Sequence, residues 1–175
     1  MSANIEFKAE LADPESAHAT ARNLSGTGPE VLQQTDVFFP CPHGRLKLRI
    51  LDDSHGQLIF YERADAPGPR RSNYQITRTA DPYTLLEILQ HVSGVSGTVE
   101  KVRSLYIVGQ TRIHVDEVKG LGSFLEIEVV LKEQQSDAEG LHIAQTLAQE
   151  FGIMESHLIH VAYVDLVRQR SGSLP

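Results

Sequence analysis

The 175-residue sequence has no tryptophan, two methionines and one cysteine, Cys41. A single cysteine excludes an internal disulfide framework and is typical of a reducing compartment. Long apolar runs are also missing, because runs such as 129–131 are far shorter than the roughly 20 apolar residues of a membrane-spanning helix. The N-terminal residues carry charges and lack the apolar core of a signal peptide. We therefore expect a soluble, cytoplasmic protein without a membrane partner.

Positive charge is in the minority, since 16 Lys and Arg stand against 23 Asp and Glu and the net charge is −7. A general nucleic-acid surface needs an excess of positive charge, so we expect no nucleic-acid partner. Hydrophobic residues make up 41% of the chain, enough to form the core of one domain of this length. No repeat, low-complexity tract or linker divides the sequence. We interpret residues 1–175 as a single domain with a frayed tail at 170–175.

Apolar and charged residues alternate with the two-residue period of β-strands over much of the chain. The alternation is clearest in residues 5–10, 45–50, 112–116 and 125–129, and further strands are predicted at 31–39, 57–63, 71–77, 98–108 and 160–167. Short segments rich in glycine and proline separate these strands, which favours antiparallel hairpins over βαβ units.

Three segments carry helix signals. Asp-Pro pairs at 13–14 and 81–82 each place an N-cap residue before a proline at the first helical position. Apolar residues recur along one helical face from 137 to 151, and Gly152 follows as a stop. About nine strands and three helices in one domain predict an α+β fold with a large antiparallel sheet.

Basic residues are sorted onto particular strands. Arg45, Lys47 and Arg49 share one face of a predicted strand, where like charges repel on a solvated sheet but stabilise a bound polyanion. An ordinary half-buried sheet with its polar face in water is the alternative interpretation. The candidate phosphate-binding cations are Lys8, Arg45, Lys47, Arg49, Arg63, Lys101, Arg103 and Arg112.

Acidic residues are paired in the same way. Glu126 and Glu128 project from one face of one strand, about 7 Å apart. Asp116 lies on the neighbouring strand and Glu6 on the first. Mg²⁺ takes one or two carboxylates while substrate phosphates supply further oxygens, so these four residues are candidate metal ligands. We interpret His114, on the same charged face, as a polar wall residue, with a metal role as the alternative.

Cations facing a carboxylate pair suit a metal–polyphosphate complex, provided that the charges face a wet or ligand-filled interior. A closed or nearly closed antiparallel β-barrel of about eight strands, with about three flanking helices, offers such an interior.

The same residues resemble the CYTH family, the triphosphate tunnel metalloenzymes, which includes class IV adenylyl cyclases, thiamine triphosphatases and inorganic tripolyphosphatases. Residues 4–8 are similar to the family's N-terminal Glu-x-Glu-x-Lys, with Asn4 in place of the first acidic residue. Residues 44–49 and 101–106 are similar to its basic strands, 112–131 to its most specific segment, and 163–166 to its closing strand. The resemblance implies a tunnel whose basic residues grip a triphosphate and whose acidic residues hold Mg²⁺ or Mn²⁺.

We therefore predict a metal-dependent enzyme that hydrolyses a small triphosphate: inorganic tripolyphosphate, thiamine triphosphate or a nucleoside triphosphate. Glu126, Glu128 and Lys8 are the predicted catalytic residues, because hydrolysis needs an activated water and cations that stabilise phosphoryl charge. One alternative is an adenylyl cyclase that converts ATP to cyclic AMP and pyrophosphate, although no base pocket is recognisable in the sequence. A non-catalytic binding module is the other, and Asn4 favours it. The resemblance also allows a homodimer.

Overall fold

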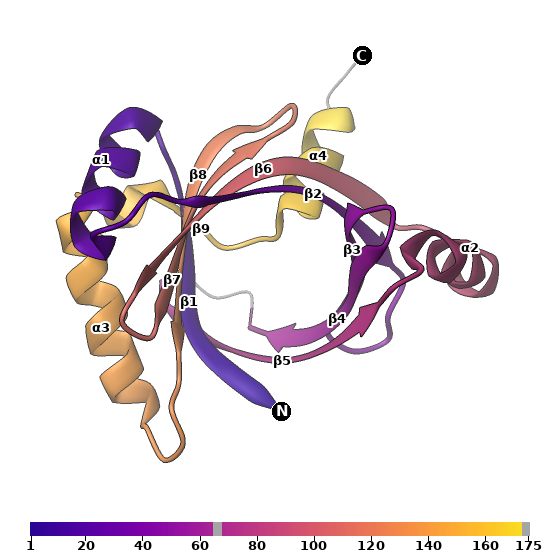
Figure 1. The fold of residues 1–175 in the computed structure, drawn as a ribbon, viewed down its shortest axis with the longest axis horizontal. Helices are drawn as coiled ribbons and strands as arrows, with labels where there is room; N and C mark the ends of the chain where they lie inside the picture. Colours follow the sequence, from indigo (N-terminus) through magenta and orange to yellow (C-terminus); the bar gives the residue numbers. More distant parts are fainter. Residues whose placement is uncertain (65–67, 173–175) are drawn as a thin grey trace.

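The strands close into one antiparallel barrel in the computed structural model, which describes residues 1–64 and 68–172 (Figure 1). Eight strands follow the order β5-β4-β3-β2-β6-β7-β8-β1, the pairing of β5 with β1 closes the ring, and the short β9 joins β1. The strands are β1 (Ser2–Glu10), β2 (Glu30–Phe39), β3 (Arg45–Asp52), β4 (His55–Arg63), β5 (Arg70–Thr79), β6 (Gly97–Val108), β7 (Thr111–Val118), β8 (Gly122–Val130) and β9 (Leu158–Ile159). The predicted α+β barrel is confirmed.

Outward-facing apolar residues of β1 to β4 and β6 to β8 are covered by helices. On one side of the barrel, α1 (Pro14–Ser25) and α3 (Asp137–Glu150) cover side chains of β1, β7 and β8, including the fully buried Ile113 and Ile127 (Figure 1). On the opposite side, α2 (Pro82–Ser93) covers apolar residues of β2 and β3. Each buried aliphatic side chain of this kind stabilises the fold by about 1.5–3 kcal/mol. The charged face is therefore the interior of the barrel, which decides against the half-buried sheet.

The predicted caps form the helix starts. The carboxylate of Asp13 accepts a hydrogen bond from the backbone N–H of Ser16 at 3.0 Å, and Asp81 accepts one from Thr84 at 3.1 Å. Ser136 and Glu139 form a reciprocal capping box that starts α3 one residue further on. No helix among the described residues is long and apolar enough to cross a membrane.

The strand predicted at 160–167 is wrong. The chain forms only β9 before it, and Tyr163–Ser171 is a fourth helix, α4, where the family resemblance implied a closing strand. The Asp165 carboxylate accepts a hydrogen bond from the backbone N–H of Ala162 at 3.1 Å, which fixes the first turn. Nearly every position from 161 to 167 is apolar, so the two-residue period of a strand cannot be told from the helical period in this segment. The helix reaches Ser171, and residues 173–175 of the tail lie outside the described chain.

Helix α4 packs against β6. Its first residues join Phe38, Val99 and Phe124 in a second apolar cluster. Gly97 at the start of β6 permits this approach, since a Cβ atom there would lie 2.5 Å from Cγ2 of Val164. Tyr163 consequently lines the barrel interior.

Candidate triphosphate and metal site

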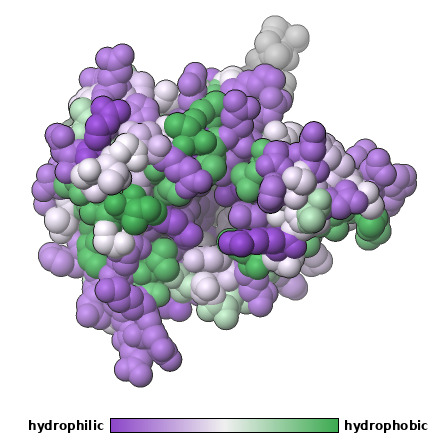
Figure 2. Space-filling model, viewed as in Figure 1, coloured by the Kyte–Doolittle hydropathy of each residue, from purple (hydrophilic) through white to green (hydrophobic). Residues whose placement is uncertain are grey.

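The barrel encloses a cavity of about 670 Å³, which is large enough for one small ligand. Figure 2 shows the molecule hollowed at the centre of the barrel, with hydrophilic residues around the opening. Among the described residues, the cavity wall carries eight cationic side chains, Lys8, Lys47, Arg49, Arg63, Arg78, Lys101, Arg103 and Arg112. Five acidic residues line it as well: Glu6, Glu30, Asp36, Glu126 and Glu128. The interior is therefore positive in a chain whose net charge is −7.

Seven of the eight predicted phosphate-binding cations line this cavity, and Arg45 does not. The guanidinium of Arg45 forms an ion pair with Asp165 of α4, with Nη2 2.9 Å from Oδ2. Arg78 lines the cavity although the prediction missed it, because β5 continues to Thr79, beyond the predicted end of that strand at 77.

On β2, Asp36 organises the basic strand β3. Its carboxylate accepts hydrogen bonds from Nε and Nη2 of Arg49, at 2.8 and 2.9 Å, and from Nζ of Lys47 at 2.8 Å. Burial alone would raise the pKa of Asp36, but Arg49 and Lys47 hold this pKa well below its ordinary value. Asp36 is not among the predicted site residues. The sequence could have indicated Asp36, because a hairpin of β2 and β3 implies a register that places it directly opposite Arg49.

A second network is centred on Arg103 of β6. Its Nε and Nη2 atoms donate to Asp116 at 2.7 and 2.6 Å, and Nη2 also donates to Glu126 at 2.7 Å. Lys101 and the hydroxyl of Tyr163 complete the shell of Asp116, at 3.2 and 3.1 Å. Asp116 is fully buried and does not line the cavity. With its carboxylate taken up by these donors, it holds the cations in place rather than facing a ligand.

Both lysines of this region have lowered pKa values. Burial is the main cause for each, and it lowers the pKa of Lys101 to about 7, with the neighbouring Arg103 adding to the effect. Lys8 lies 3.7 Å from Glu126 and 4.0 Å above the ring of Tyr163, and its pKa is also lowered, although Glu126 opposes the shift. A bound polyanion would favour the charged form of both lysines.

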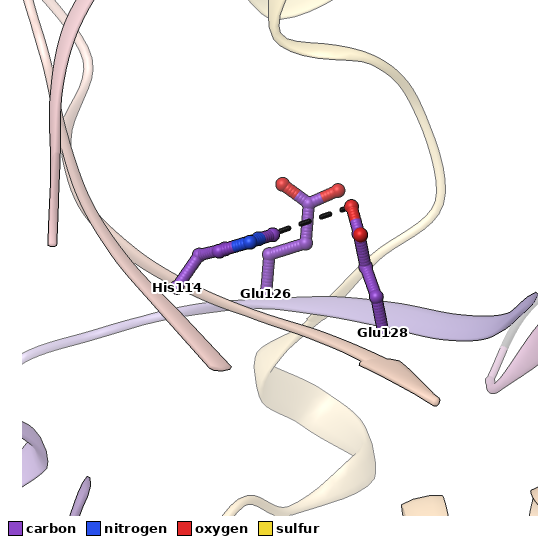
Figure 3. Close-up of side chains that lie close together, drawn as sticks. All are labelled: His114, Glu126 and Glu128. Carbon is purple, nitrogen blue, oxygen red and sulfur yellow. Dashed lines mark ion pairs between the residues drawn. The ribbon is translucent and has the colours of Figure 1, made fainter. Parts of the chain in front are cut away.

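His114, Glu126 and Glu128 point toward one another from β7 and β8 (Figure 3). One ligand atom of each lies within 4.8 Å of the others, and Nδ1 of His114 is 3.8 Å from Oε1 of Glu128. Register explains the grouping, because His114 stands directly opposite Glu126. Burial, followed by the charge of Arg103, lowers the pKa of His114 to about 3, so the imidazole is neutral. Glu6 faces Glu128 across β1 and β8, but its carboxylate pairs with Arg63 at 2.7 Å.

These three side chains fit a divalent cation. Two carboxylates and a neutral imidazole are all metal ligands, and Nδ1 of His114 is buried without a hydrogen-bond partner among the described residues. Asn4 also lines the cavity, and its buried Oδ1 is likewise without a partner in the described chain. Buried polar atoms of this kind are normally satisfied, so both point to something bound in the cavity.

The CYTH domain family matches residues 2–163. The chain belongs to the CYTH family. Adenylate cyclase CyaB of Aeromonas hydrophila is 25% identical over 176 residues, which cover 94% of this chain and 88% of the relative. The family assignment confirms the resemblance inferred from the basic strands and the 112–131 segment.

Solved structures share the CYTH barrel. The PH1012 protein of Pyrococcus horikoshii superposes with a TM-score of 0.83 at 23% identity, covering 93% of this chain and 98% of that protein. Hippeastrum HpAC1, described as having a dominant triphosphatase activity, superposes with a TM-score of 0.64 at 19% identity, covering 100% of this chain and 98% of that protein. The comparisons thus show that this chain belongs to the CYTH family and shares the fold of these proteins.

Proposed function

We propose that this CYTH chain is a metal-dependent triphosphatase that hydrolyses the terminal phosphoryl group of a triphosphate held inside the barrel. The observation that carries the proposal is the juxtaposition, in one cavity, of an excess of cations with the Glu126/Glu128 pair. A solvent-exposed sheet would gain nothing from this arrangement, whereas a triphosphate has the opposite charge and a matching need for a divalent ion.

The cations divide into two groups by position. Lys47 and Arg49 extend from β3, held by Asp36, and Arg103 extends from β6, held by Asp116. Because carboxylates behind them fix their side chains, these cations are oriented before a ligand arrives, which lowers the entropic cost of binding. Lys8 and Arg103 lie beside Glu126, and they would stabilise the charge that develops on the transferring group.

Residues Glu126 and Glu128 would hold the divalent ion, either Mg²⁺ or Mn²⁺, together with the phosphate oxygens. A bound ion of this type supplies charge neutralisation and lowers the pKa of water. The attacking water would lose its proton to a carboxylate of this pair. Replacing Glu126 by Gln keeps the side-chain volume but removes both functions.

Turnover assays test the proposal. Phosphate and pyrophosphate release would be measured from tripolyphosphate, ATP and thiamine triphosphate, with Mg²⁺ and with Mn²⁺, for the wild type and Glu126→Gln. Lys119→Met is the matched control, since Lys119 is exposed and pairs with Glu100 outside the cavity. We expect metal-dependent phosphate release that the control keeps and Glu126→Gln loses. Binding without turnover of any substrate would instead identify a non-catalytic module.

Adenylyl cyclase activity is the second candidate, and two observations favour it. One is the similarity to CyaB of Aeromonas hydrophila over 94% of this chain. The other is a smaller cavity of about 460 Å³ that adjoins the first and shares Leu32, Leu51, Gln57 and Arg78 with it. Its mixed apolar and polar wall would suit a nucleobase. Release of pyrophosphate with cyclic AMP from ATP would decide for this candidate.

A further inference from the structure

His114 is a buried histidine that the protein itself leaves partly unsatisfied. It is 3% exposed, it lies on β7 inside the barrel, and its Nδ1 atom has no hydrogen-bond partner among the described residues. A buried imidazole nitrogen without a partner is costly unless a ligand satisfies it. His18, by contrast, lies outside the cavity and is hydrogen-bonded to the hydroxyl of Tyr106 at 2.9 Å.

The surroundings of His114 direct its free nitrogen toward the two carboxylates. Oε2 of Glu126 accepts a hydrogen bond from Nη2 of Arg103 at 2.7 Å, and Oε2 of Glu128 forms an ion pair with Nη2 of Arg112 at 2.9 Å. Oε1 of Glu128 consequently faces His114 at 3.8 Å, which is too long for a hydrogen bond (Figure 3). Two ligands that each lie about 2.1 Å from one ion are separated by about 3–4 Å, so this spacing suits a shared cation.

We propose that His114 is a nitrogen ligand of the cation held by Glu126 and Glu128, and that it makes the site selective for a first-row transition ion over Mg²⁺. The inference rests on the proposed function only in that a divalent ion binds beside the carboxylate pair. It adds the identity of a ligand and the class of ion.

Ligand chemistry supplies the selectivity. Mg²⁺ prefers an octahedral shell of oxygens and gives up water reluctantly, whereas imidazole nitrogen suits first-row transition ions. Two carboxylates already compensate a divalent charge, so the third ligand is best neutral. An imidazole coordinates a metal ion in its neutral form, so His114 meets that requirement. The nearby cations Arg103 and Arg112 remain paired with the Oε2 atoms of the same two carboxylates.

Metal titration of the full-length, metal-free protein tests this inference without any substrate. Co²⁺ would be the main probe, followed by its visible absorption and by calorimetry, with Mg²⁺ measured by competition. The test variant is His114→Gln, and His142→Gln on the exposed face of α3 is the control. The melting temperature of each metal-free variant shows whether it is folded, and His114→Asn serves if His114→Gln is not.

We expect His114→Gln to weaken Co²⁺ binding by about tenfold or more and to change its absorption spectrum. Mg²⁺ affinity should change by less than about threefold, because Mg²⁺ draws little on a nitrogen ligand. Wild-type Co²⁺ affinity and spectrum in His114→Gln, or no Co²⁺ binding by the wild type, would overturn the inference. Histidine-dependent Co²⁺ binding without any triphosphate turnover would leave it standing while the proposed function fails.

Discussion

The carboxylate of Asp36 accepts two parallel hydrogen bonds from the guanidinium of Arg49, at 2.8 and 2.9 Å, across the β2–β3 pair. Lys47 adds a third at 2.8 Å. All three side chains are at least 85% buried on the barrel interior. Removing the carboxylate would therefore leave two buried cations without their compensating charge.

Asp36→Asn should destabilise the free protein by about 2–4 kcal/mol, because breaking a buried ion pair strands its partners. Chemical denaturation measures this loss. Tripolyphosphate should restore more stability to the variant than to the wild type, since a polyanion replaces the missing charge. An equal thermal shift in both proteins would contradict the idea that these cations face the ligand.

The pH dependence of the same substitution has a defined sign. Because the folded-state pKa of Asp36 is held below its ordinary value, its stabilising effect is present above about pH 4 and is lost as the pH falls toward the folded-state pKa. Asp36→Asn should thus lose less stability than the wild type on acidification. Parallel stability curves below pH 4 for the two proteins would argue against the assignment.

Lys101 provides a prediction for ligand binding. Its pKa of about 7 means that most of the Lys101 side chains are neutral at pH 8, so that the amine must take up a proton when a triphosphate binds. Affinity for tripolyphosphate should be full below pH 7 and should weaken by up to about tenfold per pH unit above it. Lys101→Arg stays charged, so its affinity should fall less over the same range. Ionisation of the ligand affects both proteins equally, and identical profiles would therefore exclude the role of Lys101.

Arg45 and Arg49 make a matched pair of basic residues on one strand. Arg49 lines the cavity, while Arg45 pairs with Asp165 of α4. Arg49→Met should weaken tripolyphosphate binding by about 100-fold, which corresponds to one lost charge-assisted contact of roughly 3 kcal/mol. Arg45→Met should change binding by less than about threefold and act on stability instead. Calorimetry measures the tripolyphosphate affinity of both variants. It thereby shows which basic residue of the strand contacts the ligand.

Gly97 tests the position of α4. Alanine at this position would bring a Cβ atom to 2.5 Å from Val164, so helix α4 must shift away from β6. We expect Gly97→Ala to lower stability by about 1–3 kcal/mol through this overpacking. Gly28→Ala is the control, because a Cβ atom at that position meets no atom within 4 Å. Similar losses in the Gly97 and Gly28 variants would contradict the close packing.

Much of this architecture follows from alternation in the sequence. The interior position of Lys47 and Arg49 could be predicted because Leu48 and Ile50 need the opposite, helix-covered face. The direction of Arg45 could not, since its partner Asp165 belongs to a helix that the apolar run 161–167 conceals. The grouping of His114 with Glu126 depends on the β7–β8 register, which the hairpin suggests but does not fix.

Calorimetric titration of the full chain with tripolyphosphate tests the central claim, that the barrel interior is a triphosphate site, most directly. The wild type should bind one tripolyphosphate per chain, and an Arg49→Met/Arg103→Met double variant should show no measurable binding. The control variant Lys119→Met should bind as the wild type does. The melting temperatures of the double variant and of the control would show that both are folded. Absence of binding by the wild type, or undiminished binding by the folded double variant, would contradict the claim.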